Sequence, residues 1–336
     1  MQVIIPMAGK GTRLRPHTHT IAKPLINVAG KPVLAHILDE LKRLKVSEII
    51  FIIGYLGDQI KDYVTKNYNF KTKFIVQEEL KGQAHAINLA KSYIKEDVII
   101  WFVDTLSDPN IEQLKKTKAD GVIYVKEHED PERFGIVFPD KKGFIEKIIE
   151  KPKNPPSNLA NIGLFYIKDY QGLFSAIDHL IKHDMQTKGE FYLVDAFNVM
   201  IERGAKFKAE RVTYWEDCGQ PETLLATNKF LLKRMPIKKY KGLSKSMIIT
   251  PVFIGEGVKI ENSIIGPYVS IAKNASIKNS IVKNSIIGEN SIVENTQITE
   301  SLIGEYAVLK GSYEKFNIGN DSQIIYGKDE SNPQAR

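Results

Sequence analysis

The chain has 336 residues, with 47 lysines and arginines against 40 aspartates and glutamates, and a single cysteine, Cys218. This length is comfortable for two domains with a sizeable core. A lone cysteine excludes a disulfide framework within the chain and favours a reducing compartment. No leader pattern precedes the first expected strand, and the longest apolar run, 98–103, is too short to span a bilayer. We therefore expect a soluble, cytoplasmic protein with no membrane partner.

The net charge of +7 does not by itself indicate a nucleic-acid partner. The lysines are scattered over amphipathic segments rather than interleaved with aromatic residues on one face. A charge of this size is typical of a solvated surface. We therefore expect no nucleic-acid partner.

The first predicted element is a short β-branched strand that ends in a turn holding Gly9 and Gly11, and the cations Arg13 and Lys23 follow closely. Glycines let backbone N–H groups approach phosphate oxygens, and fixed cations neutralise the phosphate charge. The stretch therefore predicts a site for nucleotide phosphates. It fits neither the P-loop pattern nor the dinucleotide pattern, whose third glycine is replaced by Leu14. An ordinary strand-to-helix turn is the alternative.

Strand and helix alternate over the first 228 residues. The apolar periodicity predicts helices over 33–44, 58–66 and 83–94, and strands over 48–53, 73–76 and 97–103. This alternation predicts an α/β fold with a Rossmann-like, mostly parallel sheet that is covered on both faces. Ligands bind such sheets at the carboxyl ends of the strands, where the glycine turn is expected to lie.

A carboxylate, Asp104, directly follows the apolar run 98–103. Mg²⁺ is bound by one or two such oxygens together with substrate phosphates. The residue is therefore a candidate metal ligand, and the alternative is a helix N-cap or a turn former.

Two motif blocks around the glycine turn resemble the sugar-1-phosphate nucleotidyltransferases, also called NDP-sugar pyrophosphorylases. The chain reads P-M-A-G-K-G-T-R-L-R-P from residue 6 and A-K-P-L-I-N-V-A-G-K-P-V-L from residue 22, where the family has G-x-G-T-R-L-x-P-x-T and P-K-P-L-x-P-V. Ala22 and Asn27 replace two family prolines. The resemblance implies that Arg13 and Lys23 bind and polarise phosphates in catalysis. It implies nucleotide contacts from Ala8, Gly9, Gly11, Thr12, Arg13, Gln77 and Gly82.

In the family, the glutamine and glycine matched by Gln77 and Gly82 read the edge of a pyrimidine base. An amide offers both a donor and an acceptor, which suits uracil or thymine. His85, in the same segment, is expected to face the core or solvent rather than a ligand. The resemblance also makes Asp104 a Mg²⁺ ligand, although Val103 replaces a family glycine before it.

The sugar half of the resemblance lies in four later segments. Three of them are D-P-E-R-F-G, I-E-K-P and N-I-G-L-F-Y, which match the family motifs D-P-E-R-Y-G, E-K-P and N-T-G-x-Y in that order. The fourth is Y-W-E-D-C-G, which matches W-x-D-T-G. By resemblance, Glu150 grips sugar hydroxyls and Lys151 the sugar phosphate. The implied sugar-phosphate site is Thr105, Gly135, Glu150, Lys151, Asn161 and Ile162, with Lys151 also catalytic. Asp217 would be the second metal ligand, and Cys218 has no nucleophilic role.

Two further features of this half are predicted from local pattern. The run 139–143 suits a hairpin turn. The segment from Gly189, G-E-F-Y-L-V-D-A-F, resembles a family helix in which Glu190 and Asp195 would cap and brace the pocket.

The C-terminal part is an internal repeat with a spacing of five or six residues, which is the hexapeptide pattern of a parallel β-helix. We expect its corners at Ile254, Ile260, Ile265, Ile271, Ile277, Val282, Ile287, Val293, Ile298, Ile303 and Leu309. It resembles the left-handed β-helix of several pyrophosphorylases. Hexapeptide acyltransferases normally use a histidine as general base, but the last histidine here is His183. Oligomer contact or regulation is therefore the favoured role, and a homo-oligomer is expected.

These observations predict a nucleotidyltransferase domain over 1–228, a basic linker over 229–247, a left-handed β-helix over 248–325 and a tail over 326–336. By resemblance, closest to glucose-1-phosphate thymidylyltransferases, the enzyme uses Mg²⁺ to transfer a nucleotidyl group from dTTP or UTP to glucose 1-phosphate. Mannose or N-acetylglucosamine 1-phosphate with another nucleotide is the alternative. An acyltransferase and a non-catalytic regulatory relative are disfavoured.

Overall fold

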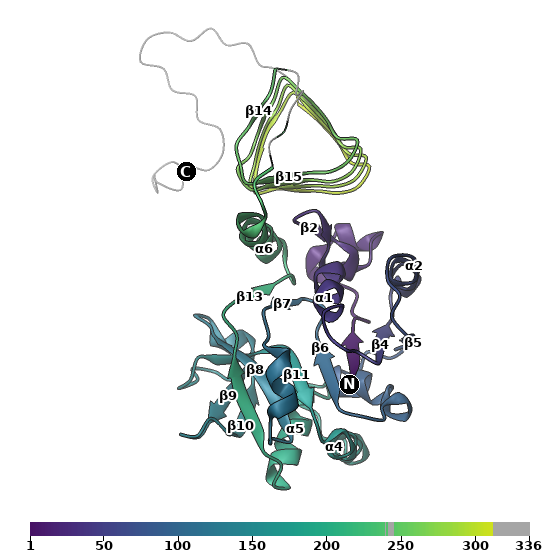
Figure 1. The fold of residues 1–336 in the computed structure, drawn as a ribbon, viewed down its shortest axis with the longest axis vertical. Coiled ribbons are helices and arrows are strands. Elements are labelled where there is room, and N and C mark those ends of the chain that lie inside the picture. The colour runs from purple at the N-terminus through teal and green to yellow at the C-terminus, as the bar shows by residue number, and fades with distance from the viewer. Residues whose placement is uncertain (239, 241–244, 312–336) are drawn as a thin grey trace.

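A computed structural model describes residues 1–238, 240 and 245–311, without the side chains of residues 112, 113 and 115. It contains a sheet-and-helix domain and a triangular stack of short strands, joined by one helix (Figure 1). No helix in these ranges is both long and apolar enough to cross a membrane.

The domain is built on one twisted sheet. Its strands, in spatial order, are β10 (Ile145–Glu150), β9 (Gly135–Pro139), β11 (Leu159–Ile167), β6 (Val98–Trp101), β1 (Gln2–Pro6), β4 (Glu48–Ile53) and β5 (Thr72–Val76), with β8 (Gly121–Glu127) linking β11 to β12 (Phe207–Arg211). β6, β1, β4 and β5 are parallel, whereas β11 runs antiparallel to β6, β8 and β9. The predicted α/β class is confirmed, and the antiparallel half was not foreseen.

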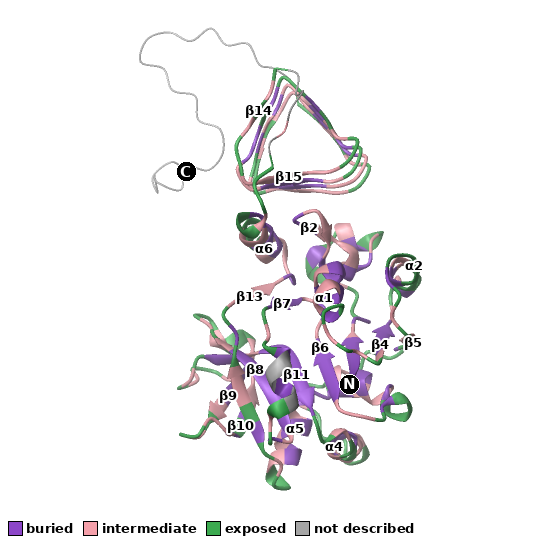
Figure 2. Cartoon of the chain, in the orientation of Figure 1, coloured by how far each residue is buried: buried purple, intermediate pink, exposed green. Residues whose placement is uncertain are grey.

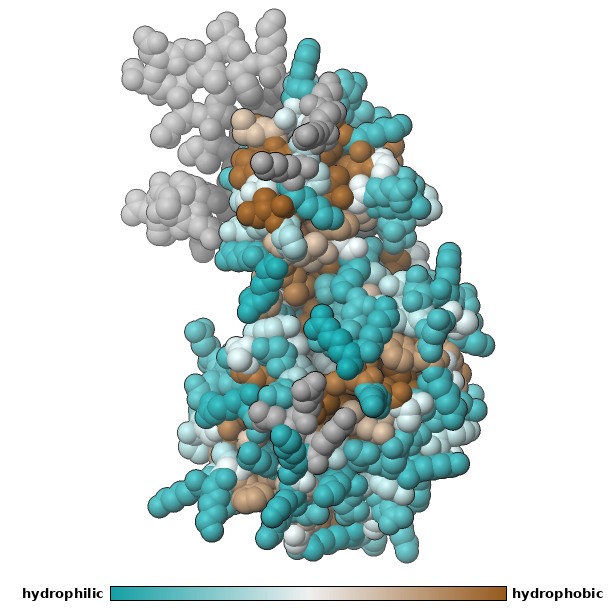
Figure 3. All heavy atoms as spheres, in the orientation of Figure 1, coloured by the Kyte–Doolittle hydropathy of each residue, from teal (hydrophilic) through white to brown (hydrophobic). Residues whose placement is uncertain are grey.

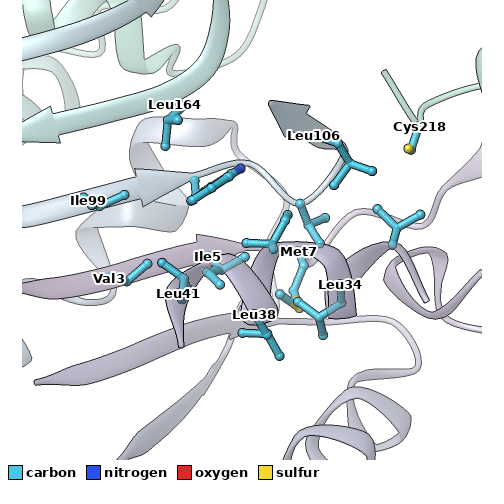
Figure 4. Close-up of a cluster of buried hydrophobic side chains, with 14 of the residues drawn as sticks. Val3, Ile5, Met7, Leu34, Leu38, Leu41, Ile99, Leu106, Leu164 and Cys218 are labelled. Atoms are coloured by element: carbon cyan, nitrogen blue, oxygen red, sulfur yellow. The ribbon is translucent and has the colours of Figure 1, made fainter. Parts of the chain in front are cut away.

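Helices cover both faces of this sheet, as the alternation predicted. They are α1 (Val33–Leu41), α2 (Gly57–Asn67), α3 (Gln83–Asn88), α4 (Tyr170–Lys182) and α5 (Leu193–Glu202). The helix α6 (Pro221–Arg234) lies outside this sheet, between it and the triangular stack (Figure 1). Val3 and Ile5 of β1 join a core with α1 and α2, while Ile4 joins a second core with α3, α4 and α5. Figure 4 shows the first of these cores where β1 meets α1, and Figure 2 shows the buried central strands.

Several expected element ends differ in the structure. The helix expected over 83–94 divides into α3 and a 3₁₀ turn, η4 (Lys91–Tyr93). Leu89 and Ala90 donate to carbonyls three residues back, which tightens the last turn and ends α3. β6 ends at Trp101, so Asp104 lies in the turn before β7 (Thr105–Ser107). The hairpin expected at 139–143 is present, with Asp140 accepting from Lys142 and Phe144.

The C-terminal stack has three parallel sheets. They are β14 (Met247–Ile248), β17 (Ile264–Ile265), β20 (Ile281–Lys283) and β23 (Gln297–Thr299); β15 (Val252–Ile254), β18 (Val269–Ile271), β21 (Ile286–Ile287) and β24 (Leu302–Ile303); and β16 (Lys259–Glu261), β19 (Ser276–Lys278), β22 (Ile292–Glu294) and β25 (Val308–Lys310). This arrangement is that of the predicted left-handed β-helix. Residues 312–325 of the predicted β-helix and the predicted tail lie outside the described ranges.

The repeat residues stack in register inside this β-helix, as in the row Ile254, Ile271, Ile287 and Ile303. They lie on strands, however, and not at the corners where they were expected. The turns between strands hold residues with positive φ, including Asn262, Asn279 and Asn295. Asparagine tolerates that conformation, whereas a β-branched residue does not.

The two parts of the molecule meet along the outer side of the β15–β18–β21–β24 sheet. Its outward row is Phe253, Ser270, Ile286 and Leu302, of which Ile286 and Leu302 join the core of the sheet-and-helix domain. Asn228 of α6 is fully buried there: its Oδ1 accepts from the Ala29 amide at 2.9 Å and from the Ser270 hydroxyl at 2.6 Å. The predicted division at residue 228 therefore falls inside α6, and we propose a boundary after Arg234 instead.

Gly30 is the tightest contact of this joint, in the hairpin of β2 (Asn27–Val28) and β3 (Lys31–Pro32). Its φ is 91°, and a Cβ there would lie 2.4 Å from the ring of Phe253. We expect Gly30→Ala to lower the free energy of unfolding by about 2 kcal/mol more than Gly204→Ala. Gly204 has a similar φ of 96° but nothing within 4 Å of its Cβ.

Denaturant unfolding of both glycine variants measures this difference. Adding Phe253→Ala to Gly30→Ala is expected to recover most of the extra loss, because it removes the clashing ring. Equal losses at the two glycines would show that the ring contact has no energetic weight.

His36 of α1 predicts a pH effect on stability. Its Nε2 bonds the Val28 carbonyl at 3.0 Å, and burial lowers its pKa from 6.5 to about 4. The unfolded chain takes up this proton near pH 6.5, whereas the folded chain takes it up only near pH 4. Stability is thus full above 6.5 and falls by up to about 3 kcal/mol as the pH drops to 4.

Unfolding measured from pH 7.5 to 4 checks this expectation. His36→Gln keeps a donor in place but does not titrate, so its stability should fall less steeply over that window. Parallel pH curves for the variant and the wild type would contradict the assignment.

Candidate active site

A cavity of about 410 Å³ opens at the carboxyl ends of β1 and β6. Nine of the residues singled out from the sequence line it: Ala8, Gly9, Gly11, Thr12, Arg13, Lys23, Gln77, Gly82 and Asp104. They come from segments far apart in the chain. The structure therefore brings the predicted nucleotide set, and one predicted metal ligand, into a single hollow.

The glycine turn presents its backbone to this cavity. A Cβ on Gly9 would have no atom within 4 Å, so that backbone is open to a ligand. Gly11 has a φ of 62°, and the Thr18 hydroxyl donates to its carbonyl at 2.8 Å. The hydrogen bond from Thr18 thus stabilises the turn, while the open backbone at Gly9 remains accessible to phosphate oxygens.

Lys23 and Asp104 form an ion pair inside the cavity, with 2.6 Å between Nζ and Oδ2. Burial alone would raise the pKa of Asp104, but the charge and hydrogen bond of Lys23, with a contribution from Arg13, hold it below its ordinary value. Asp104 is therefore ionised at neutral pH.

Asp217 lies beside this pair at the end of β13 (Trp215–Asp217), which pairs with β7. The Cys218 amide donates to the Asp104 carbonyl at 3.0 Å, and the Gly219 amide donates to Asp217 Oδ1 at 2.8 Å. Burial and the negative charge of Asp104 raise the pKa of Asp217. The two carboxylates thus repel each other in a shared site, which a cation would relieve.

Cys218, next to this carboxylate, is fully buried, and burial raises the pKa of its thiol. A neutral, enclosed thiol is inert as a nucleophile, in agreement with the expectation from the sequence.

Gln77 and Gly82, the two residues predicted to read the base, also line the cavity. Gln77 follows β5 and is buried. Gly82 has a φ of 105°, and a Cβ there would lie 2.7 Å from the backbone of Phe191. No other residue type fits this close approach without displacing the Phe191 backbone. Glu190, across from Gly82, also lines the cavity.

The predicted sugar residues form a second group on the antiparallel half of the sheet. Glu150 of β10 pairs with Gly135 of β9, where a Cβ would lie 2.9 Å from Glu150 Oε2. The Asn161 amide donates to the Gly135 carbonyl at 2.9 Å. Lys151 Nζ lies 3.6 Å from Glu150 Oε1. Burial and the charge of Asp195 raise the pKa of Glu150, although Lys151 opposes this.

Two members of the predicted sugar set are oriented differently from this group. Thr105 is buried, and its hydroxyl donates to the Ile162 carbonyl. The side chain of Ile162 belongs to the core. These residues can shape the site through the backbone, but their side chains do not line the cavity.

The helix expected from the segment 189–197 begins only at Leu193, and its N-cap is Tyr192 with no side-chain hydrogen bond. Glu190, which was expected to brace the pocket, lines the cavity. Asp195 is not among the described residues that line it, and its Oδ2 is buried without a hydrogen-bond partner in the described chain.

A larger groove of about 870 Å³ runs along the β-helix, lined by Asn262, Asn279, Asn295 and their neighbours. The amides bond one another, with 2.9 Å from Asn262 to Asn279 and from Asn279 to Asn295. The nearby sheet exposes Met247 and Ile264, and Figure 3 shows apolar surface on this part of the molecule. Among the described residues, its lining includes no carboxylate, histidine or thiol, so size alone does not make it a catalytic site.

The fold and this cavity define a nucleotidyltransferase. The model of the nucleotidyl transferase family matches residues 2–234, and the chain belongs to that family. The match ends with the last residue of α6.

Its relatives narrow the class to the sugar-1-phosphate nucleotidyltransferases, enzymes of nucleotide-sugar biosynthesis. The low-salt glycan biosynthesis nucleotidyltransferase Agl11 of Haloferax volcanii is 31% identical over 96% of this chain and 99% of its own. The bifunctional protein GlmU of Methanocaldococcus jannaschii is 34% identical over 91% and 78%. The glucose-1-phosphate thymidylyltransferase of Streptomyces griseus is 26% identical over 94% and 95%. The resemblance drawn from the motifs is thus confirmed.

A solved structure of UDP-glucose pyrophosphorylase with UDP-glucose has the same fold, with a TM-score of 0.62. It is 21% identical and covers 70% of this chain and 99% of that one.

Proposed function

We propose that this enzyme transfers a uridylyl or thymidylyl group from UTP or dTTP to glucose 1-phosphate, releasing pyrophosphate. The observation that carries the proposal is the cavity in which the glycine turn, the Lys23–Asp104 pair and Gln77 meet. A phosphate cradle, a charged centre and a base-reading amide are the parts that a nucleoside triphosphate requires. The thymidylyltransferase relative supports the choice of sugar and base.

In this proposal the triphosphate lies along the turn from Gly9 to Arg13, with its base on Gln77 and Gly82. Arg13 and Lys23 neutralise the phosphate oxygens, while Glu150 orients the sugar hydroxyls and Lys151 holds the sugar phosphate. Gly135 and Asn161 complete the sugar side.

The reaction is an in-line displacement. An oxygen of the sugar phosphate attacks the α-phosphorus, a new O–P bond forms, and the bond to the bridging oxygen of the β-phosphate breaks. The electron pair leaves with pyrophosphate. No protein nucleophile is needed, so positioning and charge neutralisation supply the acceleration.

We propose Mg²⁺ as the cofactor, held by Asp104 and Asp217. The residues fit it, because two acidic oxygen donors, Asp104 and Asp217, share the site. Mg²⁺ prefers few carboxylates and completes its shell with water and phosphate oxygens. When bound, it supplies further charge neutralisation on the phosphates.

Pyrophosphate release measured over a matrix of nucleoside triphosphates and sugar 1-phosphates tests the proposal. We expect the highest kcat/KM for UTP or dTTP with glucose 1-phosphate. A preference for N-acetylglucosamine 1-phosphate or mannose 1-phosphate would support the alternative sugar considered from the sequence. Release with a purine triphosphate alone would overturn the assignment of the base. The expected homo-oligomer stays a prediction, which light scattering would measure.

A further inference from the structure

A histidine stands directly behind the base-reading amide. His85 belongs to α3, one turn after Gly82, and its Nδ1 lies 3.4 Å from Nε2 of Gln77. The backbone N–H of Gln77 donates to the Ile53 carbonyl at 2.8 Å, which holds the Gln77 backbone in place. In the described part of the chain, His85 is the one side chain that bonds the Gln77 amide. Sequence reasoning assigned this histidine to core or solvent, because it did not show what the ring faces.

The hydrogen-bond partner of a side-chain amide determines which of its two polar atoms faces the cavity. A carboxamide has a donor nitrogen and an acceptor oxygen, so a partner that accepts from the nitrogen leaves the oxygen to face the cavity. Uracil and thymine carry an N–H at N3, which such an oxygen accepts. Cytosine carries a lone pair at N3, which the same oxygen repels.

The surroundings of His85 keep its ring in the accepting form. Burial and the charge of Lys81 lower the pKa of the ring, while Glu79 opposes them. Lys81 is itself paired with Glu79. The lowered pKa favours the uncharged imidazole at neutral pH, and in the tautomer that carries its proton on Nε2 the ring accepts from Gln77 through Nδ1.

We propose that His85 is a positioning residue for base selection, holding the Gln77 amide so that its oxygen meets the N3–H of uracil or thymine. This inference rests on the proposed function, because it concerns the nucleotide of that same site. His85 itself does not touch the base.

Three variants test this role. His85→Leu keeps bulk but removes the acceptor, whereas His85→Asn can return an acceptor oxygen near the place of Nδ1. His179→Leu, on α4, is the matched control, because the His179 ring packs on His183 and makes no hydrogen bond to Gln77 within the described residues. For each protein, kcat/KM is measured with UTP and with CTP, and the binding of both nucleotides is measured by calorimetry with Mg²⁺.

We expect His85→Leu to lower the UTP-to-CTP ratio roughly tenfold, through a higher KM for UTP. His85→Asn should keep the ratio within about threefold of wild type, and His179→Leu should leave it unchanged. A purely structural role would weaken both nucleotides equally, so an unchanged ratio in a folded His85→Leu protein overturns the inference.

The two proposals fail in different ways. If the wild type releases no pyrophosphate with any substrate pair, the proposed function fails, and the ratio of binding constants still decides the role of His85. If the wild type turns over UTP but binds CTP equally well, the base selection fails while the transferase proposal stands.

Discussion

Replacing Asp217 with asparagine is expected to lower the turnover number at least about 100-fold while the protein stays folded. Asp217 and Asp104 are the two carboxylates of the proposed cation site, and each feels the charge of the other. The substitution keeps the shape and the acceptor oxygen that Gly219 bonds, but it removes one negative charge. Because that charge is buried and repelled, thermal stability should hold or rise.

Asp104→Asn should cause a loss of similar size, since it also removes the charge that pairs with Lys23. Pyrophosphate release at saturating substrates gives the rate, and a thermal melt reports the fold. Asp62→Asn, an exposed aspartate on α2, serves as the control and should match the wild type. Rates within a few fold of wild type in the two site variants would remove these residues from the proposed metal site.

The second large effect is expected at Lys151. Lys151→Ala should raise KM for the sugar 1-phosphate by about 10- to 100-fold and change KM for the nucleotide far less. Its ammonium lies beside Glu150 in the sugar group, apart from the cavity that holds the nucleotide set. Loss of a charge-assisted contact to one phosphate should therefore weaken one substrate selectively.

Steady-state kinetics with each substrate varied in turn measures this split. Lys153→Ala, an exposed lysine two positions further on, is the matched control for a general loss of positive charge. If KM for the nucleotide rose more than KM for the sugar phosphate, Lys151 would belong to the triphosphate side.

The sequence predicted what local pattern determines. The six-residue spacing identified inward residues such as Ile271 and Ile287, because each must stack on the coil below. The alternation of strands and helices over the first 228 residues predicted a mostly parallel sheet covered on both faces, because the helices that connect parallel strands pack against the sheet. The glycine turn was also found from local pattern, because Gly11 has a left-handed backbone conformation that favours glycine.

Long-range geometry could not be read in this way. Thr105 stands where the family motif has a sugar-contacting asparagine, but its hydroxyl donates to the Ile162 carbonyl, and the packing of β11 against β7 brings the two residues together. Glu190 lines the cavity, and His85 contacts the Gln77 side chain, because α3 and the segment before α5 fold together around Gly82. No spacing within either segment encodes that meeting.

The outward row of the β15–β18–β21–β24 sheet also determines how the β-helix is aligned on the catalytic domain. The inward rows are almost entirely isoleucine and valine, so one coil resembles the next from inside. The docking row is Phe253, Ser270, Ile286 and Leu302, and no two of its rungs are alike. Sliding the stack by one rung, about 4.8 Å, would set a serine against Gly30 and deprive Asn228 of its hydroxyl donor. The inside of the β-helix is thus regular, whereas its outward row is not. That irregular row allows the β-helix to dock on the catalytic domain in a single alignment.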